Sequence, residues 1–346
     1  MTAVVPAQGR ATFYELQAKN RRNSVMLVVV FVGMVAALGA GFDYFFLGVG
    51  SRGADGGGMP FPIATFGALI FGSLYAMQGW YLGASQVLGA SRARPADPAN
   101  PAEKQFLNVV DEMAIAAGIT APKAYVVPDP DPNAFAVGRD PAHASIAVTE
   151  GLLASLDREE LQGVIGHEMS HVRNLDIRAM TLVTALFGAA TLLADVTRRG
   201  LYWGGGGRSN RSRDSDRSGG GGGIMLVLFV LWLLLAILAP LLGRMLVLAV
   251  SRSREYLADA SSAELTRNPL GLASALRKIA GAHEPTRLIN QGSAHLCITD
   301  PRGLKLNESE NAAADLFGTH PPIGKRIQIL ESMAGVVSSE GPIGGS

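Results

Sequence analysis

The segment His167-Glu-Met-Ser-His171 has the residue types and the spacing of a catalytic metal site. Positions four apart lie on one face of a helix, so both imidazoles can reach one ion, with Glu168 beside them as a candidate general base. Such a site binds zinc and activates water for peptide-bond cleavage. We expect the motif by chance in roughly one chain of this kind in two hundred, so the surrounding sequence has to support it.

The residues before the motif predict that it lies inside a helix. Asp157 is a typical N-cap, and Glu160 follows at the position where a carboxylate completes a capping box. Apolar residues then recur at helical spacing, at Leu161, Val164, Ile165, Met169 and Val172. The alternative is a surface helix with two solvated histidines, which would need no further acidic partner.

A catalytic zinc generally takes three protein ligands, so a third ligand has to come from elsewhere in the chain. Glu255 is favoured because residues 251–259 read as a helix that carries Glu255 and Asp259 four apart on one face. Glu255 would bind zinc while Asp259 orients a liganding imidazole. A surface helix in which Glu255 pairs with neighbouring arginines explains the spacing equally well. Other residues remain formally possible: Glu150, His283, His295, His320 and further acidic residues after the last apolar stretch.

The composition resembles that of a membrane protein. Hydrophobic residues make up 48%, charged residues only 17%, and the mean hydropathy is +0.23. The net charge of +1 gives no indication of a nucleic-acid partner. The single cysteine, Cys297, excludes an internal disulfide and a cysteine-based zinc site.

Four apolar stretches predict a multi-pass protein in contact with a lipid bilayer. They cover residues 24–40, 61–84, 179–193 and 224–242, and the third is the shortest. The first stretch follows a polar leader longer than that of a usual signal peptide, and a second stretch follows it. We therefore expect a retained anchor rather than a cleaved signal.

Residues 101–178 predict a small soluble α+β unit. A helix through Phe106, Val109, Val110 and Met113 precedes three period-two stretches, at 124–127, 134–137 and 145–148, which are separated by turn residues. This pattern predicts a small antiparallel sheet followed by the metal helix. An edge strand of that sheet can pair with an extended substrate backbone, although these residues can equally be ordinary core.

The predicted fold is α+β, predominantly helical, with about four transmembrane helices and a gluzincin-like catalytic domain. The N-terminal tail is 1–23, the first two spans lie in 24–84, and the first part of the catalytic domain is 85–178. A transmembrane hairpin at 179–250 contains a glycine- and arginine-rich loop, 195–223, which we expect to be disordered. Residues 251–346 complete the catalytic domain and form the C-terminal tail.

The spacing of the candidate ligands agrees with that hairpin. His171 precedes the third apolar stretch by eight residues, and Glu255 follows the end of the fourth by thirteen. Continuous helices would place the two ligands roughly 10–20 Å outside the hydrocarbon region. The two ligands can meet only if the third and fourth stretches leave and return to the same face of the membrane.

The chain resembles the HtpX-like membrane zinc metallopeptidases, and more distantly the CAAX prenyl endopeptidases and the mitochondrial stress peptidase OMA. The resemblance extends from about Asn23 to Ile329. It rests on four motifs in order: Pro132-Asn-Ala-Phe-Ala-Val-Gly138, His167-Glu-Met-Ser-His171 continuing to Asn174, Ser251-Arg-Ser-Arg-Glu255-Tyr-Leu-Ala-Asp259, and Thr319-His-Pro-Pro-Ile-Gly-Lys-Arg-Ile327. The arginine-rich loop departs from the family pattern.

The resemblance implies a role for each matched residue. His167, His171 and Glu255 would bind one Zn²⁺, and Glu168 would activate water. Asp259 and Asn174 would support the metal helices. His320 and Arg326 would stabilise the oxyanion or hold the Pro-rich turn. The substrate-cleft candidates are Asn133, Ala134, Phe135 and Ala136.

The family also implies an inner-membrane location with a cytoplasmic catalytic domain. The basic residues Lys19, Arg21, Arg22, Arg92 and Arg94 agree with that orientation by the positive-inside rule, whereas six arginines in the 195–223 loop oppose it. The ligand spacing determines only which segments share one side of the membrane, so we retain the cytoplasmic orientation.

The leading functional interpretation is an integral-membrane zinc endopeptidase that cleaves misfolded or damaged membrane proteins during stress, with membrane-protein or peptide substrates. A prenyl-protein processing enzyme is the second interpretation, but four spans are fewer than its large intramembrane chamber would require. The third is a membrane scaffold with structural zinc, which a closed fourth coordination site would support. The oligomeric state is not predicted.

Overall fold

The structure is a computed structural model that describes residues 13–47, 49, 61–186, 227–234, 252–282, 286, 288, 296–299 and 321–335. The elements in chain order are α1 (Phe13–Phe46), α2 (Ile63–Ala90), β1 (Arg94–Pro95), α3 (Pro101–Ala117), β2 (Lys123–Val127), β3 (Ala134–Gly138), a 3₁₀ turn (Pro141–His143), β4 (Ala144–Thr149), α4 (Glu150–Ser155), α5 (Arg158–Arg173), α8 (Arg252–Thr266), α9 (Pro269–Ala280) and α12 (Ile323–Met333). Residues 176–186 and 227–234 are also helical.

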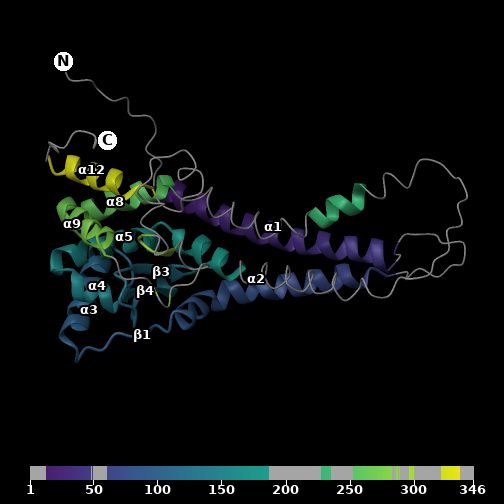
Figure 1. The fold of residues 1–346 in the computed structure, drawn as a ribbon, viewed down its shortest axis with the longest axis horizontal. Coiled ribbons are helices and arrows are strands. Elements are labelled where there is room, and N and C mark those ends of the chain that lie inside the picture. Colours follow the sequence, from purple (N-terminus) through teal and green to yellow (C-terminus); the bar gives the residue numbers. More distant parts are fainter. Residues whose placement is uncertain are drawn as a thin grey trace, which may run out of the picture.

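Helices α1 and α2 run side by side and form an arm that projects from the rest of the protein (Figure 1). They approach closely at Gly39, where a Cβ atom would lie 2.7 Å from the Ala64 carbonyl oxygen. Much of the arm's surface consists of large apolar side chains, including Val29 (63% exposed) and Ile70 (62% exposed). Such a surface is stable only against another apolar phase.

The predicted count of four spans is not confirmed. Among the described residues, only the helix Gln17–Phe45 is long and apolar enough by itself to cross a membrane. The second half of the third apolar stretch and most of the fourth lie outside the described residues, as does the 195–223 loop. One part of the fourth stretch is placed: Trp232 donates its indole N–H to the Leu38 carbonyl oxygen at 3.1 Å, so residues 227–234 lie beside α1.

The sheet is mixed, and the prediction of an antiparallel sheet is wrong. Its strand order is β1-β2-β4-β3, with β2 and β4 parallel and the other two pairs antiparallel. A short turn joins β3 to β4 as an ordinary hairpin. The hairpin adds to β2 through its second strand, β4, so β3 becomes an outer strand and β2 and β4 point the same way.

Both faces of the sheet are covered. Val126, Ala134, Ala136, Ile146 and Val148 face a core shared with α3, α5 and α9. The alternate residues Val127, Phe135, Val137 and Ala147 pack instead on Val87 and Leu88 at the end of α2. The period-two pattern therefore separates two apolar environments, rather than an apolar face from a solvated one.

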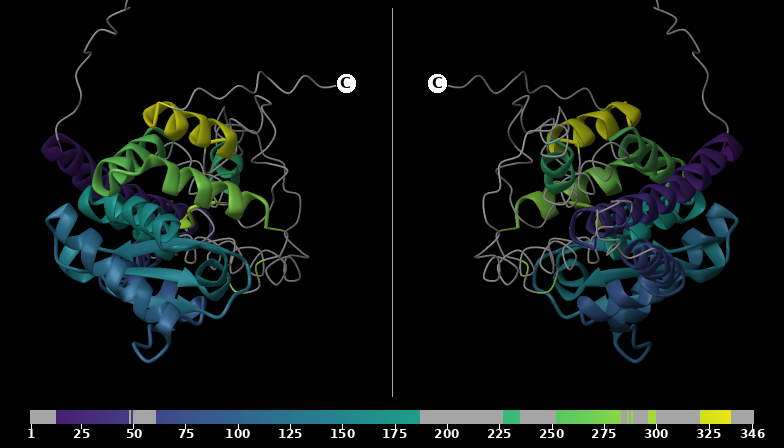
Figure 2. Two further views of the ribbon diagram at one scale, coloured as in Figure 1. Left: turned by 90° about the vertical axis from the view of Figure 1, so that its left-hand side faces the viewer. Right: turned by 90° about the vertical axis from the view of Figure 1, so that its right-hand side faces the viewer.

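Helix α5, which carries the predicted metal motif, is the centre of the part of the molecule outside the α1–α2 arm, residues 94–173 with α8, α9 and α12; we call this part the catalytic half after that prediction. Viewed along the arm, α8, α9 and α12 lie on one side of α5 and the sheet lies on the other (Figure 2). Close packing needs small residues on α5: a Cβ atom at Gly163 would lie 2.6 Å from the Leu272 backbone nitrogen on α9. The Ser262 hydroxyl on α8 also donates to the Gly163 carbonyl oxygen at 2.6 Å.

Candidate metal centre and active site

Helix α5 carries the three motif residues, as its sequence predicts. The capping box is confirmed, because the Asp157 carboxylate accepts from the Glu160 backbone N–H and the Glu160 carboxylate accepts from that of Asp157. His167, Glu168 and His171 are all buried within the protein. The helix therefore places two imidazoles and a carboxylate in an interior where an ionic group needs a partner.

Glu255 on α8 meets both histidines. Its Oε2 atom lies 3.6 Å from His167 Nε2, its Oε1 atom lies 3.6 Å from His171 Nε2, and the two Nε2 atoms are 3.3 Å apart. Tetrahedral zinc, with bonds of about 2.0–2.2 Å, separates its ligand atoms by roughly 3.3–3.5 Å. Three buried acceptors converging at this spacing fit such an ion. Glu150, an alternative ligand, lies on α4 beside Arg94 instead.

Each histidine has a carboxylate behind it. Asp259 Oδ1 lies 2.9 Å from His167 Nδ1, and Asp176 Oδ2 lies 3.2 Å from His171 Nδ1. A carboxylate at Nδ1 fixes the tautomer that leaves Nε2 available to a metal. Sequence reasoning found Asp259 and missed Asp176. Its position five residues after His171, just beyond the end of α5, was the available signal.

Arg326 on α12 closes the network from behind. Its Nε donates to Asp259 Oδ2 at 2.8 Å and its Nη2 donates to Asp259 Oδ1 at 2.7 Å, which makes a bidentate pair. The side chain is 0% exposed, and Nη1 lies 3.7 Å from Glu255 Oε2. The structure thus places Arg326 among the groups that support the ligands.

The charges of this network alternate, and the pKa values follow from that. Burial lowers the pKa of His167, but hydrogen bonds to Asp259 and Glu255 outweigh it and raise that pKa to about 9. Burial raises the pKa of Asp259, whereas the Arg326 charge and hydrogen bonds lower it to about 2. Asp259 is therefore ionised at neutral pH. A proton on His167 Nε2 competes with a metal for the same lone pair.

Asn174 lies at the C-terminal end of α5 and links the site to the arm. Its side-chain amide donates to Ser170 Oγ at 3.2 Å, and its carbonyl oxygen accepts from the Asn20 side chain on α1 at 2.8 Å. The same Asn20 amide donates to Asp176 Oδ1 at 2.6 Å. The carboxylate that orients His171 is thus held from the domain end of helix α1.

The predicted cleft residues lie on β3 and just before it. Ala134 and Ala136 face the core around α5, whereas Phe135 faces α2, so the four residues do not share one environment. Asn133 is 1% exposed and its side chain donates to the Thr299 carbonyl oxygen at 3.2 Å. His320 lies outside the described residues.

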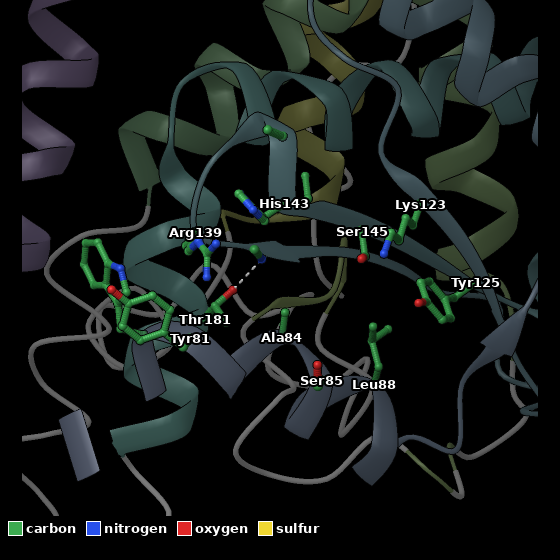
Figure 3. Close-up of a pocket in the computed structure, with 14 residues that line it drawn as sticks. Tyr81, Ala84, Ser85, Leu88, Lys123, Tyr125, Arg139, His143, Ser145 and Thr181 are labelled. Atoms are coloured by element: carbon green, nitrogen blue, oxygen red, sulfur yellow. Dashed lines mark hydrogen bonds between the residues drawn. The ribbon is translucent and has the colours of Figure 1, made fainter. Parts of the chain in front are cut away.

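A separate cavity of about 200 Å³ lies between α2 and the sheet (Figure 3). Its lining includes Tyr81 and Ser85 from α2, Tyr125 from β2 and Ser145 from β4. These strand residues belong to the face of the sheet that turns away from α5 and contacts α2. The cavity contains none of the candidate ligands, so it is not the site of the predicted chemistry.

The chain matches the model of peptidase family M48 over residues 101–334. That match includes α5, Glu255 on α8 and Arg326 on α12.

Similar curated proteins extend the match to nearly the whole chain. A protease HtpX homolog from Caldanaerobacter subterraneus is 41% identical over 94% of this chain and 99% of its own length. The homologs from Thermoanaerobacter pseudethanolicus and Streptococcus uberis are 41% and 39% identical, over 94% and 92% of this chain and 99% of each relative. Among solved structures, Ste24p of S. mikatae aligns with a TM-score of 0.47 and 17% identity, over 92% of this chain and 67% of that one.

Proposed function

Since the chain belongs to peptidase family M48, and within it to the HtpX-like membrane metallopeptidases, we propose that it is a zinc-dependent endopeptidase of membrane proteins. One observation carries the proposal: His167, His171 and Glu255 converge in the interior, next to Glu168. A structural ion would need no buried carboxylate between its two histidine ligands. A hydrolase needs one to move protons.

His167, His171 and Glu255 would hold the ion. When bound, zinc lowers the pKa of a coordinated water toward neutrality and polarises the substrate carbonyl. Glu168 accepts the proton of the attacking water and returns a proton to the leaving amine. Asp259 and Asp176 keep both histidines in the tautomer that points Nε2 at the ion. Arg326 neutralises the buried charge of Asp259.

We assign misfolded or damaged membrane proteins as substrates, in a stress-response role. The arm supports this assignment because its exposed apolar side chains require a bilayer, and the domain end of α1 touches the site through Asn20. A site attached so closely to a membrane helix meets segments that emerge from the lipid. The protein would be a multi-pass protein of the cell inner membrane, with its catalytic domain on the cytoplasmic side.

The test compares wild-type protein with Glu168→Gln, both purified in detergent and loaded with zinc. Gln keeps the shape of Glu168 but cannot accept the proton, so we expect normal zinc content and at least a hundredfold loss of cleavage of an unfolded membrane-protein substrate. Zinc is measured by elemental analysis and cleavage by gel electrophoresis and mass spectrometry.

A matched control is Glu112→Gln on α3, which changes a partly exposed carboxylate outside the metal centre. Full turnover by Glu168→Gln would refute the mechanism. In cells, identical membrane proteomes with the active and the Glu168→Gln proteins would refute the quality-control role.

A further inference from the structure

Strand β3 is the outer strand of the sheet, and its outward backbone groups are partly occupied. The Asn133 carbonyl oxygen bonds the Thr149 N–H on the side of β4. Backbone groups alternate along an antiparallel strand, so Ala134, Ala136 and Gly138 direct theirs away from β4. The Thr181 hydroxyl accepts from the Gly138 N–H at 3.0 Å. The Ala134 N–H donates to the Asn133 side-chain oxygen at 3.1 Å, which leaves the Ala134 carbonyl oxygen and the Ala136 backbone as the positions where another strand can add.

Residues 296–299 of the same chain add there. The Ile298 N–H donates to the Ala134 carbonyl oxygen at 2.9 Å, and Cys297 forms an antiparallel bridge with Phe135. The Asn133 side chain then bonds the Thr299 carbonyl oxygen. Leu296 lies in a 3₁₀ turn and Ile298 and Thr299 lie in a bend, so the contact is one bridge with its flanking hydrogen bonds, a short form of the pattern by which a peptide adds to the edge of a sheet.

The added segment lies beside the metal centre. Arg326 Nη1 donates to the Ile298 carbonyl oxygen at 2.9 Å and lies 3.7 Å from Glu255 Oε2, so one nitrogen contacts both the segment and a metal ligand. The other two nitrogens of the same guanidinium hold Asp259, which holds His167. A peptide bound along β3 at this height would likewise contact Arg326 and, through it, the groups that hold the ligands.

The side chain of Ile298 is held as firmly as its backbone. It is 1% exposed and belongs to the same apolar core as Val164 and Ile165 of the metal helix. Leu296 and Cys297 are buried with Phe135 instead, 3% and 1% exposed. Cys297 and Ile298 thus enter different environments, as neighbouring side chains of a bound strand do, whereas Leu296 shares the environment of Cys297.

We propose that residues 296–299 act as an internal pseudosubstrate: they occupy the peptide-binding edge of β3 beside the metal centre and have to leave before a substrate strand binds. The inference rests on the proposed function and adds its regulation. It also assigns the substrate class, an extended segment with a branched aliphatic residue at the position of Ile298. Because the competitor is part of the chain, its effective concentration is high. The apparent affinity for substrate equals the intrinsic affinity multiplied by the fraction of molecules in which the segment is displaced.

A disulfide across the bridge tests the proposal. The Ile298-to-Ala134 hydrogen bond flanks the pair Phe135 and Cys297, which makes it a non-hydrogen-bonded pair, with a typical Cα separation of about 4.5 Å that suits a disulfide. Cys297 is the only cysteine of the chain, so Phe135→Cys creates a single possible crosslink. Oxidation then locks the segment in place, and tris(carboxyethyl)phosphine releases it.

The readout is binding, so that it does not depend on turnover. The variant also carries Glu168→Gln, is purified as the full zinc-loaded chain in detergent, and is mixed with a fluorescein-labelled peptide that copies residues 293–300 with serine in place of cysteine. We expect the oxidised form to bind this peptide at least tenfold more weakly than the reduced form, by fluorescence anisotropy. Both forms share the cavity left by Phe135, so the comparison isolates the crosslink.

The control adds Cys297→Ser, which prevents the disulfide, and its binding should not respond to the oxidant. Equal peptide binding by the oxidised and reduced forms, with the disulfide verified by mass spectrometry, overturns the pseudosubstrate alone. Absence of peptide binding in both forms overturns the assignment of β3 as the peptide-binding edge and, with it, the inference.

In the wild-type background, Ile298→Ala should raise kcat/KM for an unrelated extended peptide about tenfold, because the competitor loses its main anchor. An unchanged or lower kcat/KM in a variant with full zinc content would contradict the proposal. Wild-type protein that binds peptide but cleaves none would instead refute the proposed function and leave the pseudosubstrate standing.

Discussion

The catalytic half of the molecule and the α1–α2 arm use opposite means of stabilisation. Around the metal centre, ionisable side chains such as Asp259 and Arg326 are buried and paired, and the apolar core is closed on all sides. In the arm, large apolar side chains such as Val29 and Ile70 are exposed, and the two helices are joined at one end by Asp43, which accepts from Ala64 and Thr65. The first region therefore supplies its own interior, whereas the second depends on a surrounding lipid phase.

The two regions meet at few polar positions. Asn20 on α1 holds Asp176 and the end of α5, and Gln17 donates to the Arg173 carbonyl oxygen at 2.9 Å. A change in the tilt of α1 thus reaches the carboxylate that orients His171. The site is therefore held internally by buried ion pairs but anchored to a helix that packs against the bilayer.

The largest expected effect comes from leaving a buried charge of the catalytic half without its ion-pair partner. Arg326→Leu leaves the Asp259 carboxylate buried without its bidentate partner, which should cost about 3–5 kcal/mol of unfolding free energy. Urea unfolding of the metal-free protein in detergent measures it. Adding Asp259→Asn removes the stranded charge, so the double variant should be more stable than Arg326→Leu. Equal stability of the single and double variants would show that the unpaired charge of Asp259 is not the cause of the loss.

A matched pair of apolar truncations separates the regions directly. Leu161 on the metal helix α5 is 2% exposed in the core, so Leu161→Ala should cost about 2–5 kcal/mol. Val29 is 63% exposed on the arm, so Val29→Ala should change stability in detergent by less than about 0.5 kcal/mol. Similar losses for the two would contradict an arm that packs mainly against lipid.

A smaller effect is expected from the carboxylate that sequence reasoning missed. Asp176→Asn removes the charge behind His171 and should weaken zinc binding about 10–100-fold, as seen for such supporting groups. Competition with a chromophoric chelator measures the affinity. Asp111→Asn makes the same chemical change at an exposed position of α3 and should leave the affinity unaltered. An unchanged affinity for Asp176→Asn would remove it from the metal centre.

The smallest effect is a pH dependence confined to the catalytic half. A bidentate hydrogen bond from Arg94 holds the pKa of Glu103 below its ordinary value, despite the opposing effect of burial. A lowered folded-state pKa stabilises the fold above the ordinary pKa of about 4.5, and this contribution disappears as the pH falls toward the folded value. Glu103→Gln should therefore lose less stability than wild type between pH 6 and about pH 3. Melting temperatures that fall by the same amount in the two proteins over this pH range would contradict the prediction.

Local features of the fold were predictable because neighbouring residues determine them. The capping box at Asp157 and the apolar spacing through Val172 predict α5 within a residue of its observed bounds. The strands at 123–127, 134–138 and 144–149 extend the predicted stretches by a residue or two at most. Their pairing was not predictable, because alternation specifies which residues share a face and not which strand lies next to which.

Five consecutive residues determine the chemistry of the site, because a helix alone brings His167, Glu168 and His171 together. What completes the site depends on contacts over long sequence distances. Only the tertiary structure separates Glu255 from the other acidic candidates, puts Asp176 behind His171, and brings residues 296–299 to the edge of β3. The physical reason is range: helical periodicity relates residues within a few turns, whereas burial and packing decide which distant side chains share an interior.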